Sequence, residues 1–271
     1  MRYNRLNSRY DHPMTGGGAI ATYLVTGAGG RAALIDAGAG DADHLRALDA
    51  SLGSRSPGLE DVFVTHGHID HVGGAPALQA AYPGARFSKH EPVNAFAIEG
   101  VSSIEWRPLV DGQTVDAAGT PLTVLHTPGH APDHVVFWHE ASGTVLTGDL
   151  VISGSSVIIP HTRGGDLLDY LASIERVREL RPSRLLPAHG PEINDPEAVL
   201  LATREHRERR EREILERLSA RTMSVPGLVE SIYHGLAPGL ARAAQESVRA
   251  HLEKLRREGR AVEENGLWQE R

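Results

Sequence analysis

The chain has 271 residues, of which 40% are hydrophobic and 23% charged, and its net charge is −7. This composition is typical of a globular protein with a sizeable core, and the acidic balance argues against a general nucleic-acid coat. There is no cysteine, but there are 15 histidines. Disulfide scaffolds, thiolate catalysis and cysteine-ligated zinc or iron–sulfur sites are therefore excluded, and any metal must be bound through nitrogen and oxygen.

The first part of the chain alternates short apolar runs with helical patterns. Runs bounded by Gly, Pro or Asp predict strands at residues 19–25, 32–38, 61–65, 113–115, 122–125, 135–138, 144–147 and 184–187. Apolar residues at helical spacing predict helices at 41–52, 75–81 and 166–180. This alternation predicts a layered α/β domain. We interpret the polar stretch Lys89, His90 and Glu91 as a solvated loop.

The chain becomes charged and helical after Pro191. Helices are predicted at 197–219, 224–233 and 239–258, and the Asn265-Gly266 turn predicts a hairpin over 261–268. Three helices and a hairpin are similar to a winged helix, so we expect two domains, 1–195 and 196–271. Glutamates alternate with the arginines of the first of these helices, so we interpret most of these arginines as solvated partners: Arg204, Arg207, Arg209, Arg210, Arg212 and Arg217. We expect four histidines at the surface: His139, His206, His234 and His251.

No targeting or membrane segment is expected. Residues 1–15 lack an apolar run of signal-peptide length, and no stretch approaches about eighteen consecutive apolar residues. We therefore expect a cytoplasmic protein that does not enter a membrane.

The densest cluster of metal-binding side chains follows the predicted strand at 61–65. It contains His66, His68, Asp70 and His71 and precedes a helix. Neutral imidazole binds zinc, iron or manganese at about 2.0–2.1 Å, and a carboxylate adds an oxygen ligand. Because Asp70 and His71 directly follow the first pair, they can address a second ion beside the first.

Three later residues, His130, Asp149 and His189, each lie just beyond a predicted strand and beside Gly or Pro. Each alone is more typical of an ordinary loop. Together with the first cluster they predict a site for two divalent ions. Zinc is the first expectation, with iron or manganese as alternatives, because nitrogen and oxygen ligands accept all three.

In this order, the seven residues resemble the metallo-β-lactamase superfamily pattern H-x-H-x-D-H followed by His, Asp and His. Other segments resemble the lactamase-β-like endoribonuclease group and its bacterial relatives: residues 13–15, 125–130, 165–174, 189–191 and 206–211. The resemblance implies an αββα sandwich with a winged-helix-like helical domain at the C-terminus. It also implies one ion held by His66, His68 and His130, and another held by Asp70, His71 and His189, with Asp149 bridging.

The expected activity is metal-dependent hydrolysis. A water or hydroxide held by two divalent ions is a nucleophile near neutral pH, so we expect metal-bound hydroxide to attack an ester, thioester or lactone carbonyl. Asp70 is the predicted catalytic residue, which orients this nucleophile and shuttles its proton. His161, Arg163 and Tyr23 are predicted to bind substrate. The lack of cysteine departs from zinc β-lactamases that place Cys in the second site, which weakens a lactamase interpretation.

Two other functions stay open. One is a single-strand-specific endoribonuclease that cleaves phosphodiesters at the same site, so the partner is a small acyl substrate or single-stranded RNA. Residues 197–271 carry 14 basic and 13 acidic residues, which leaves −8 on the rest of the chain and no evident electrostatic track for RNA. The other is a winged-helix nucleic-acid-binding regulator. Homo-oligomer formation also stays open.

Overall fold

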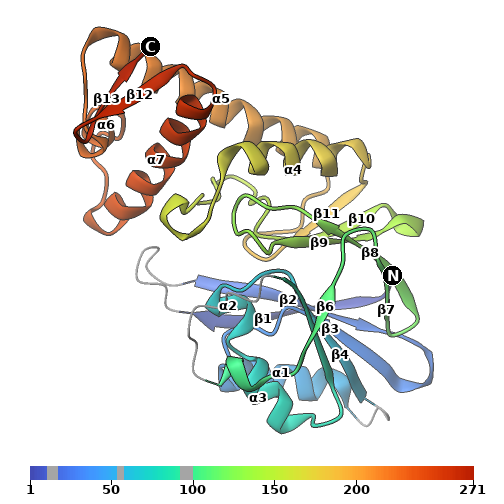
Figure 1. Cartoon of the computed structure of the whole chain (residues 1–271). Helices are drawn as coiled ribbons and strands as arrows, with labels where there is room; N and C mark the ends of the chain where they lie inside the picture. The colour runs from blue at the N-terminus through green and yellow to red at the C-terminus, as the bar shows by residue number, and fades with distance from the viewer. Residues whose placement is uncertain (11–17, 54–57, 92–99) are drawn as a thin grey trace.

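The computed structural model describes residues 1–10, 18–53, 58–91 and 100–271. Two β-sheets face each other and helices cover their outer faces, so the layers run α, β, β, α (Figure 1). The C-terminal helices and hairpin extend from the layer that covers the second sheet. This confirms the expected αββα sandwich with an added helical domain. Within the described residues, no helix combines the length and apolar character needed to span a bilayer.

The first sheet has the strand order β1-β2-β3-β4-β5-β6. β1, β2 and β3 pair antiparallel, whereas β3 to β6 pair parallel. Leu48 of α1 and Leu78 of α3 are buried against its outer face. The elements are β1 (Tyr3–Tyr10), β2 (Gly18–Thr26), η1 (Ala28–Gly30), β3 (Arg31–Ile35), α1 (Ala42–Leu52), β4 (Gly58–Val64), α2 (Ile69–Val72), α3 (Ala75–Ala81), β5 (Arg86–His90), η2 (Val101–Ser103) and β6 (Trp106–Leu109).

The second sheet has the order β11-β10-β9-β8-β7, with only the β10–β11 pair parallel among its described pairings. Its outer face is covered by α4, whose residues Tyr170, Ile174 and Val177 are buried. The elements are β7 (Thr114–Ala117), β8 (Thr120–His126), β9 (Val135–His139), η3 (Glu140–Ser142), β10 (Thr144–Gly148), η4 (His161–Arg163), α4 (Leu167–Glu179) and β11 (Arg184–Pro187).

An apolar core between the sheets fixes their relative position. Phe63 of β4 and Phe137 of β9 lie with ring centroids 6.0 Å apart, and Ile35, Val124 and Leu146 are buried in the same core. Removing this apolar surface from water is the main force that holds the two sheets together. The residues that follow β4, β8, β10 and β11 are thereby brought to one edge of the sandwich.

The C-terminal part has a core of its own. Ile214, Leu228, Leu252 and Trp268 are buried together there. Backbone hydrogen bonds between Met223 and Trp268 attach the hairpin to the helices. The elements are α5 (Pro196–Ala220), α6 (Val225–Ile232), η5 (Pro238–Leu240), α7 (Ala241–Arg257), β12 (Ala261–Glu264) and β13 (Leu267–Glu270). The proposed division between residues 195 and 196 stays a prediction.

Several expectations from sequence are wrong. Lys89 and His90 belong to β5 and not to a solvated loop, because the Lys89 ammonium is buried in an ion pair with Asp133. β1 and β6 were not predicted. His139 and His251 are buried and not at the surface. Arg207 is also buried, not solvated. The Pro13-Met14-Thr15 segment lies outside the described residues.

Candidate metal centre

The loop after β4 folds back on itself and brings its histidines to the sheet edge. The His68 carbonyl accepts hydrogen bonds from the amides of His71 and Val72, which starts the short helix α2 that carries Asp70 and His71. At the end of this helix the chain passes close to the loop after β3. A Cβ on Gly74 would lie 2.2 Å from the Ala37 carbonyl oxygen, so this approach requires glycine.

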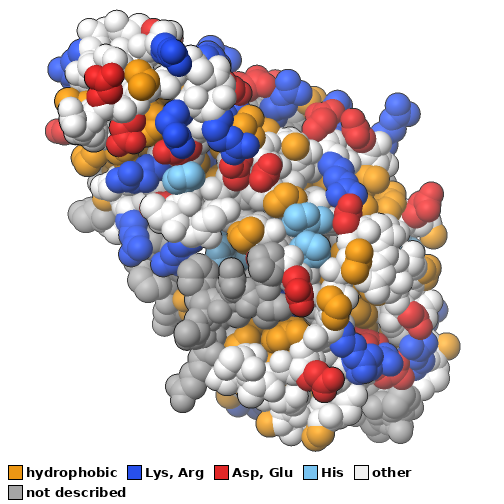
Figure 2. All heavy atoms as spheres, viewed as in Figure 1, with side chains coloured by type: hydrophobic (Ala, Val, Ile, Leu, Met, Phe, Trp, Pro, Cys, Tyr) orange, Lys and Arg blue, Asp and Glu red, His pale blue; other side chains and the backbone are white. Residues whose placement is uncertain are grey.

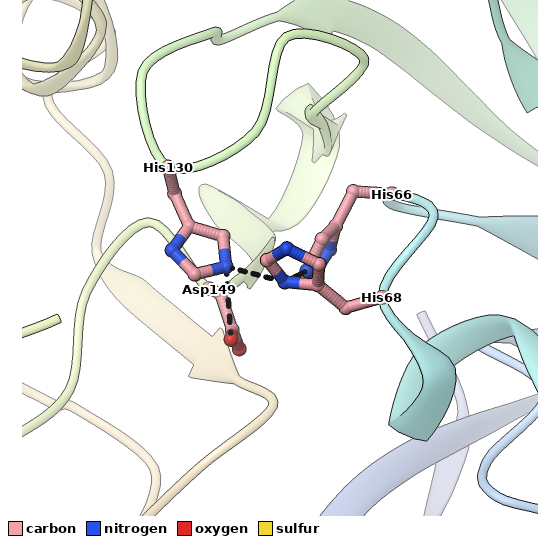
Figure 3. Close-up of side chains that lie close together, drawn as sticks. All are labelled: His66, His68, His130 and Asp149. Carbon is pink, nitrogen blue, oxygen red and sulfur yellow. Dashed lines mark hydrogen bonds and ion pairs between the residues drawn. The ribbon is translucent and has the colours of Figure 1, made fainter. Parts of the chain in front are cut away.

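The first group of converging side chains is His66, His68, His130 and Asp149 (Figure 3). Nδ1 of His68 lies 2.9 Å from Nε2 of His66 and 2.9 Å from Nε2 of His130. Oδ2 of Asp149 lies 3.5 Å from Nε2 of His130. These four residues come from the loops after β4, β8 and β10, far apart in the sequence.

The second group is Asp70, His71 and His189. Oδ2 of Asp70 lies 3.3 Å from Nε2 of His189 and 3.8 Å from Nε2 of His71. Oδ1 of Asp149 lies 3.4 Å from Nε2 of both histidines. One carboxylate oxygen of Asp149 therefore faces each group, so the structure brings all seven sequence-predicted residues together with Asp149 between the two groups.

The protonation pattern of these histidines fits a metal. Nδ1 of His130 lies 2.7 Å from the Ile158 carbonyl oxygen, and Nδ1 of His71 lies 3.0 Å from Oδ2 of Asp36. Because these oxygens only accept, each Nδ1 carries a proton, and in the neutral ring each Nε2 presents a lone pair. Nε2 of His71 and Oδ1 of Asp149 are buried and have no hydrogen-bond partner among the described residues. Such converging lone pairs repel each other unless a cation lies between them.

His66 presents its lone pair in the same way. The Thr65 hydroxyl donates to Asp36 at 2.9 Å, so it accepts from Nδ1 of His66 at 3.1 Å. Asp36 also accepts the Thr65 backbone amide at 2.8 Å. One carboxylate thus orients two of the histidines, which is how outer residues fix ligand tautomers in metal sites. Sequence reasoning missed Asp36 and Thr65.

His134 orients a third residue of the site. Its Nε2 accepts the Asp149 amide at 3.1 Å, while its Nδ1 lies 2.9 Å from the Thr127 hydroxyl. His126 lies 2.8 Å from the Pro132 carbonyl oxygen through Nε2, and makes a ring contact with His90.

The electrostatics differ between the two groups. Burial, and then the neighbouring histidines, hold the pKa values of His66 and His68 below their usual range, so both rings are neutral ligands. Burial opposes a charge on Asp149, but His189 and His71 outweigh it and hold its pKa well below the usual range. Burial likewise opposes a charge on His71, but Asp36 and Asp149 outweigh it and raise its pKa. The carboxylates therefore favour a positive charge at the second group more than at the first.

The predicted substrate residues are placed differently from one another. His161 and Arg163 lie on η4, shortly after the Ile158 carbonyl that His130 contacts, with Arg163 exposed. Tyr23 is 2% exposed and its hydroxyl donates to the Pro187 carbonyl at 2.8 Å. This contact holds the end of β11 that leads to His189, so we assign Tyr23 to support and not to substrate contact.

Tyr10, at the end of β1, lies within electrostatic range of Asp70 and Arg163, which the sequence did not reveal. Burial raises the pKa of its hydroxyl, the Asp70 carboxylate adds to this, and Arg163 opposes it. The ring itself is half-buried. No pattern in the sequence distinguishes this tyrosine from others in a polar strand.

Comparison with known proteins gives the family. The model of the metallo-beta-lactamase superfamily matches residues 15–189, and that of the beta-lactamase associated winged helix domain matches residues 224–268. A beta-lactamase-like protein 2 homolog from Drosophila melanogaster is 31% identical over 248 residues, covering 88% of this chain and 82% of that protein. An atrochrysone carboxyl ACP thioesterase from Aspergillus fumigatus is 34% identical, covering 73% of this chain and 44% of that protein.

Solved structures agree with this assignment. A metallo-beta-lactamase family protein from Thermus thermophilus has a TM-score of 0.81 at 25% identity and covers 99% of this chain and 98% of its own. A protein solved in a di-iron-bound form has a TM-score of 0.55 at 30% identity and covers 68% of this chain and 93% of its own. The resemblance inferred from the sequence is thereby confirmed. The chain belongs to the metallo-β-lactamase superfamily and is a metal-dependent hydrolase.

Proposed function

We propose that this protein hydrolyses an acyl thioester or ester of a small molecule at a site that holds two zinc ions. His66, His68 and His130 would hold one ion and Asp70, His71 and His189 the other, with one Asp149 oxygen on each. The observation that carries this proposal is the position of Asp149, whose two oxygens lie 3.4–3.5 Å from ligand nitrogens of both groups. Iron is the alternative metal, since the related di-iron protein is matched over most of its length.

Bound divalent ions supply an activated water and polarise the carbonyl under attack. A side chain of the protein itself transfers the proton. Asp70 is held beside His189 and has a lowered pKa because, although burial opposes its charge, His71 and His189 favour it. It can therefore accept a proton from the attacking water and pass it to the departing thiol or alcohol. Asp36 and His134 keep the surrounding ligands in place.

The charge distribution favours a small acyl substrate over RNA. On the face of the C-terminal part that Figure 2 shows, Lys and Arg side chains are interleaved with Asp and Glu. Arg204 pairs with Glu208, Arg210 with Glu213, and Arg207 is buried. A protein that follows a phosphate backbone needs such cations free. The thioesterase named among the relatives points to the same substrate class.

A substrate panel tests this proposal. Zinc-loaded protein should hydrolyse acyl thioesters or esters and leave single-stranded RNA intact. Asp70→Asn should lower kcat by about 10²–10⁴-fold, the usual contribution of a positioned acid or base. Ser51→Ala, on helix α1 at the outer face of the first sheet, serves as the control that should keep full activity.

Two results would favour the endoribonuclease or the nucleic-acid-binding regulator over the acyl hydrolase. Cleavage of RNA without thioester hydrolysis would replace the acyl proposal with the endoribonuclease. A mobility shift of DNA that weakens steeply with salt, without any hydrolysis, would favour the winged-helix regulator. A cytoplasmic location and a homo-oligomer stay predictions.

A further inference from the structure

The connection between β10 and α4, residues 150–165, orients part of the metal centre although η4 is its only regular element in the described structure. It starts directly after Asp149, and its Ile158 carbonyl accepts Nδ1 of His130 at 2.7 Å. Its apolar residues Val157 and Ile159 are buried in one core with Leu200 of α5 and Ala250 of α7. An irregular segment therefore fixes a ligand, and it packs against the C-terminal helices.

Arg207 of α5 contacts this loop at its centre. The side chain is 2% exposed, and Nη2 donates to the carbonyl of Val157, the residue before Ile158. Its guanidinium carbon lies 5.3 Å from the ring centroid of Tyr170, whose hydroxyl donates to the Leu150 carbonyl at 2.8 Å. Arg207 thus holds the loop directly at Val157, next to Ile158. Through Tyr170 it also supports the loop at Leu150, next to Asp149.

Glu246 of α7 contacts the same loop at η4. Its two carboxylate oxygens accept the backbone amide and the hydroxyl of Thr162, each at 2.9 Å. Thr162 lies between His161 and Arg163, and Glu246 is 8% exposed. A bidentate contact with a buried carboxylate fixes both the backbone and the side chain of η4.

We propose that Arg207 and Glu246 are positioning residues through which the C-terminal helices clamp the 150–165 loop onto the metal centre. Arg207 keeps the Ile158 carbonyl in place for His130, and Glu246 keeps η4 in place further along the same loop. The planar guanidinium both donates to Val157 and stacks on Tyr170, which a lysine cannot do at once. The inference rests on the proposed metal site for its effect on binding, but the clamp itself is testable without metal.

Zinc affinity tests the role of Arg207. In full-length protein titrated against a chromophoric chelator, Arg207→Met should weaken one of the two zinc ions by about 10–100-fold, as loss of outer contacts does elsewhere, and leave the other unchanged. Arg207→Lys should restore this affinity only in part. Arg204→Met is the matched control, because Arg204 lies one turn away on α5 with Glu175 and Glu208 as its partners. Circular dichroism establishes that each variant is folded.

Amide hydrogen exchange tests the role of Glu246. The Thr162 amide should exchange faster in Glu246→Ala, while Glu246→Gln, which keeps an acceptor oxygen, should retain most of the protection. The alanine variant should also raise KM more than it lowers kcat. Glu253→Ala is the control, since Glu253 lies on the same helix and pairs with Arg256.

Wild-type zinc affinity in Arg207→Met, together with unchanged Thr162 exchange in Glu246→Ala, would overturn the clamp. If the wild-type protein binds no metal, the proposed function fails. The exchange experiment then still decides whether the clamp exists.

Discussion

At the residue scale, Lys89 and Asp133 show how a charged pair ties the two sheets together. Lys89 lies on β5 of the first sheet, and Asp133 lies in the loop before β9 of the second. The Lys89 side chain is fully buried and that of Asp133 nearly so. Each charge is tolerated in this interior because the other lies against it.

Asp133→Asn should therefore lower the free energy of unfolding by about 3–5 kcal/mol, because it leaves the Lys89 ammonium buried without its carboxylate. Denaturant titration measures this loss. Asp43→Asn is the control: Asp43 pairs with Arg46 at the exposed surface, and its loss should cost about 1 kcal/mol or less. Equal losses in both variants would contradict a stabilising role for the buried pair.

The sequence predicted the candidate metal ligands better than the residues that orient them. The seven candidate ligands are recognisable because their residue types and spacing are rare outside such sites. Asp36, Thr65 and Tyr10 are single polar residues in ordinary strand-end sequence, and only the folded chain brings them to the site. Arg207 was predicted as a solvated partner because its helix alternates Arg and Glu. The alternation gave no sign that this one position faces the core.

At the scale of elements, strands with alternating or apolar sequence were predictable and polar strands were not. β2, β4 and β9 have buried runs that indicate strands directly. β1 lies at the sheet edge and buries few side chains, so its polar sequence resembles a loop. β5 carries the buried Lys89, and β6 contains Pro108 at the opposite edge. Their pairing partners, not their own sequence, make them strands.

Helix α7 carries a titratable group that couples stability to pH. His251 is buried, and neither ring nitrogen has a hydrogen-bond partner among the described residues. Burial, and then Arg207, Arg210, Lys254 and His206, hold the pKa of this ring well below its usual value. The folded state therefore excludes a proton that the unfolded chain binds below about pH 6.5.

The stability associated with neutral His251 is thus present above about pH 6.5 and is lost as the pH falls below it. Relative to His251→Leu, the wild-type free energy of unfolding should fall by about 1 kcal/mol between pH 6.5 and 5.5, and the slope should approach about 1.4 kcal/mol per pH unit below that range. Denaturant titration of both proteins at these pH values measures the difference. The metal ligands titrate in both proteins, so their contribution cancels in the difference between the two free energies of unfolding. Parallel pH profiles would contradict the assignment.

At the scale of the whole molecule, the αββα sandwich and its added helical domain were predictable because both have distinct element patterns. The contacts that join the two parts were not predictable. Arg207 reaches Val157, Glu246 reaches Thr162 and Arg257 pairs with Asp166, contacts that join residues 50 to 91 positions apart. No local pattern in the sequence indicates such pairs. The C-terminal helices are therefore part of the frame around the candidate site, and not a separate appendage.

The central claim is that seven side chains form one site for two ions. Elemental analysis of full-length protein, loaded with zinc and freed of excess metal, tests it most directly. Wild type should contain about two zinc ions per chain, and His68→Ala and His189→Ala about one each, since each removes one ligand of a different ion. Fewer than two ions in the wild type, or an unchanged content in both variants, would contradict the account.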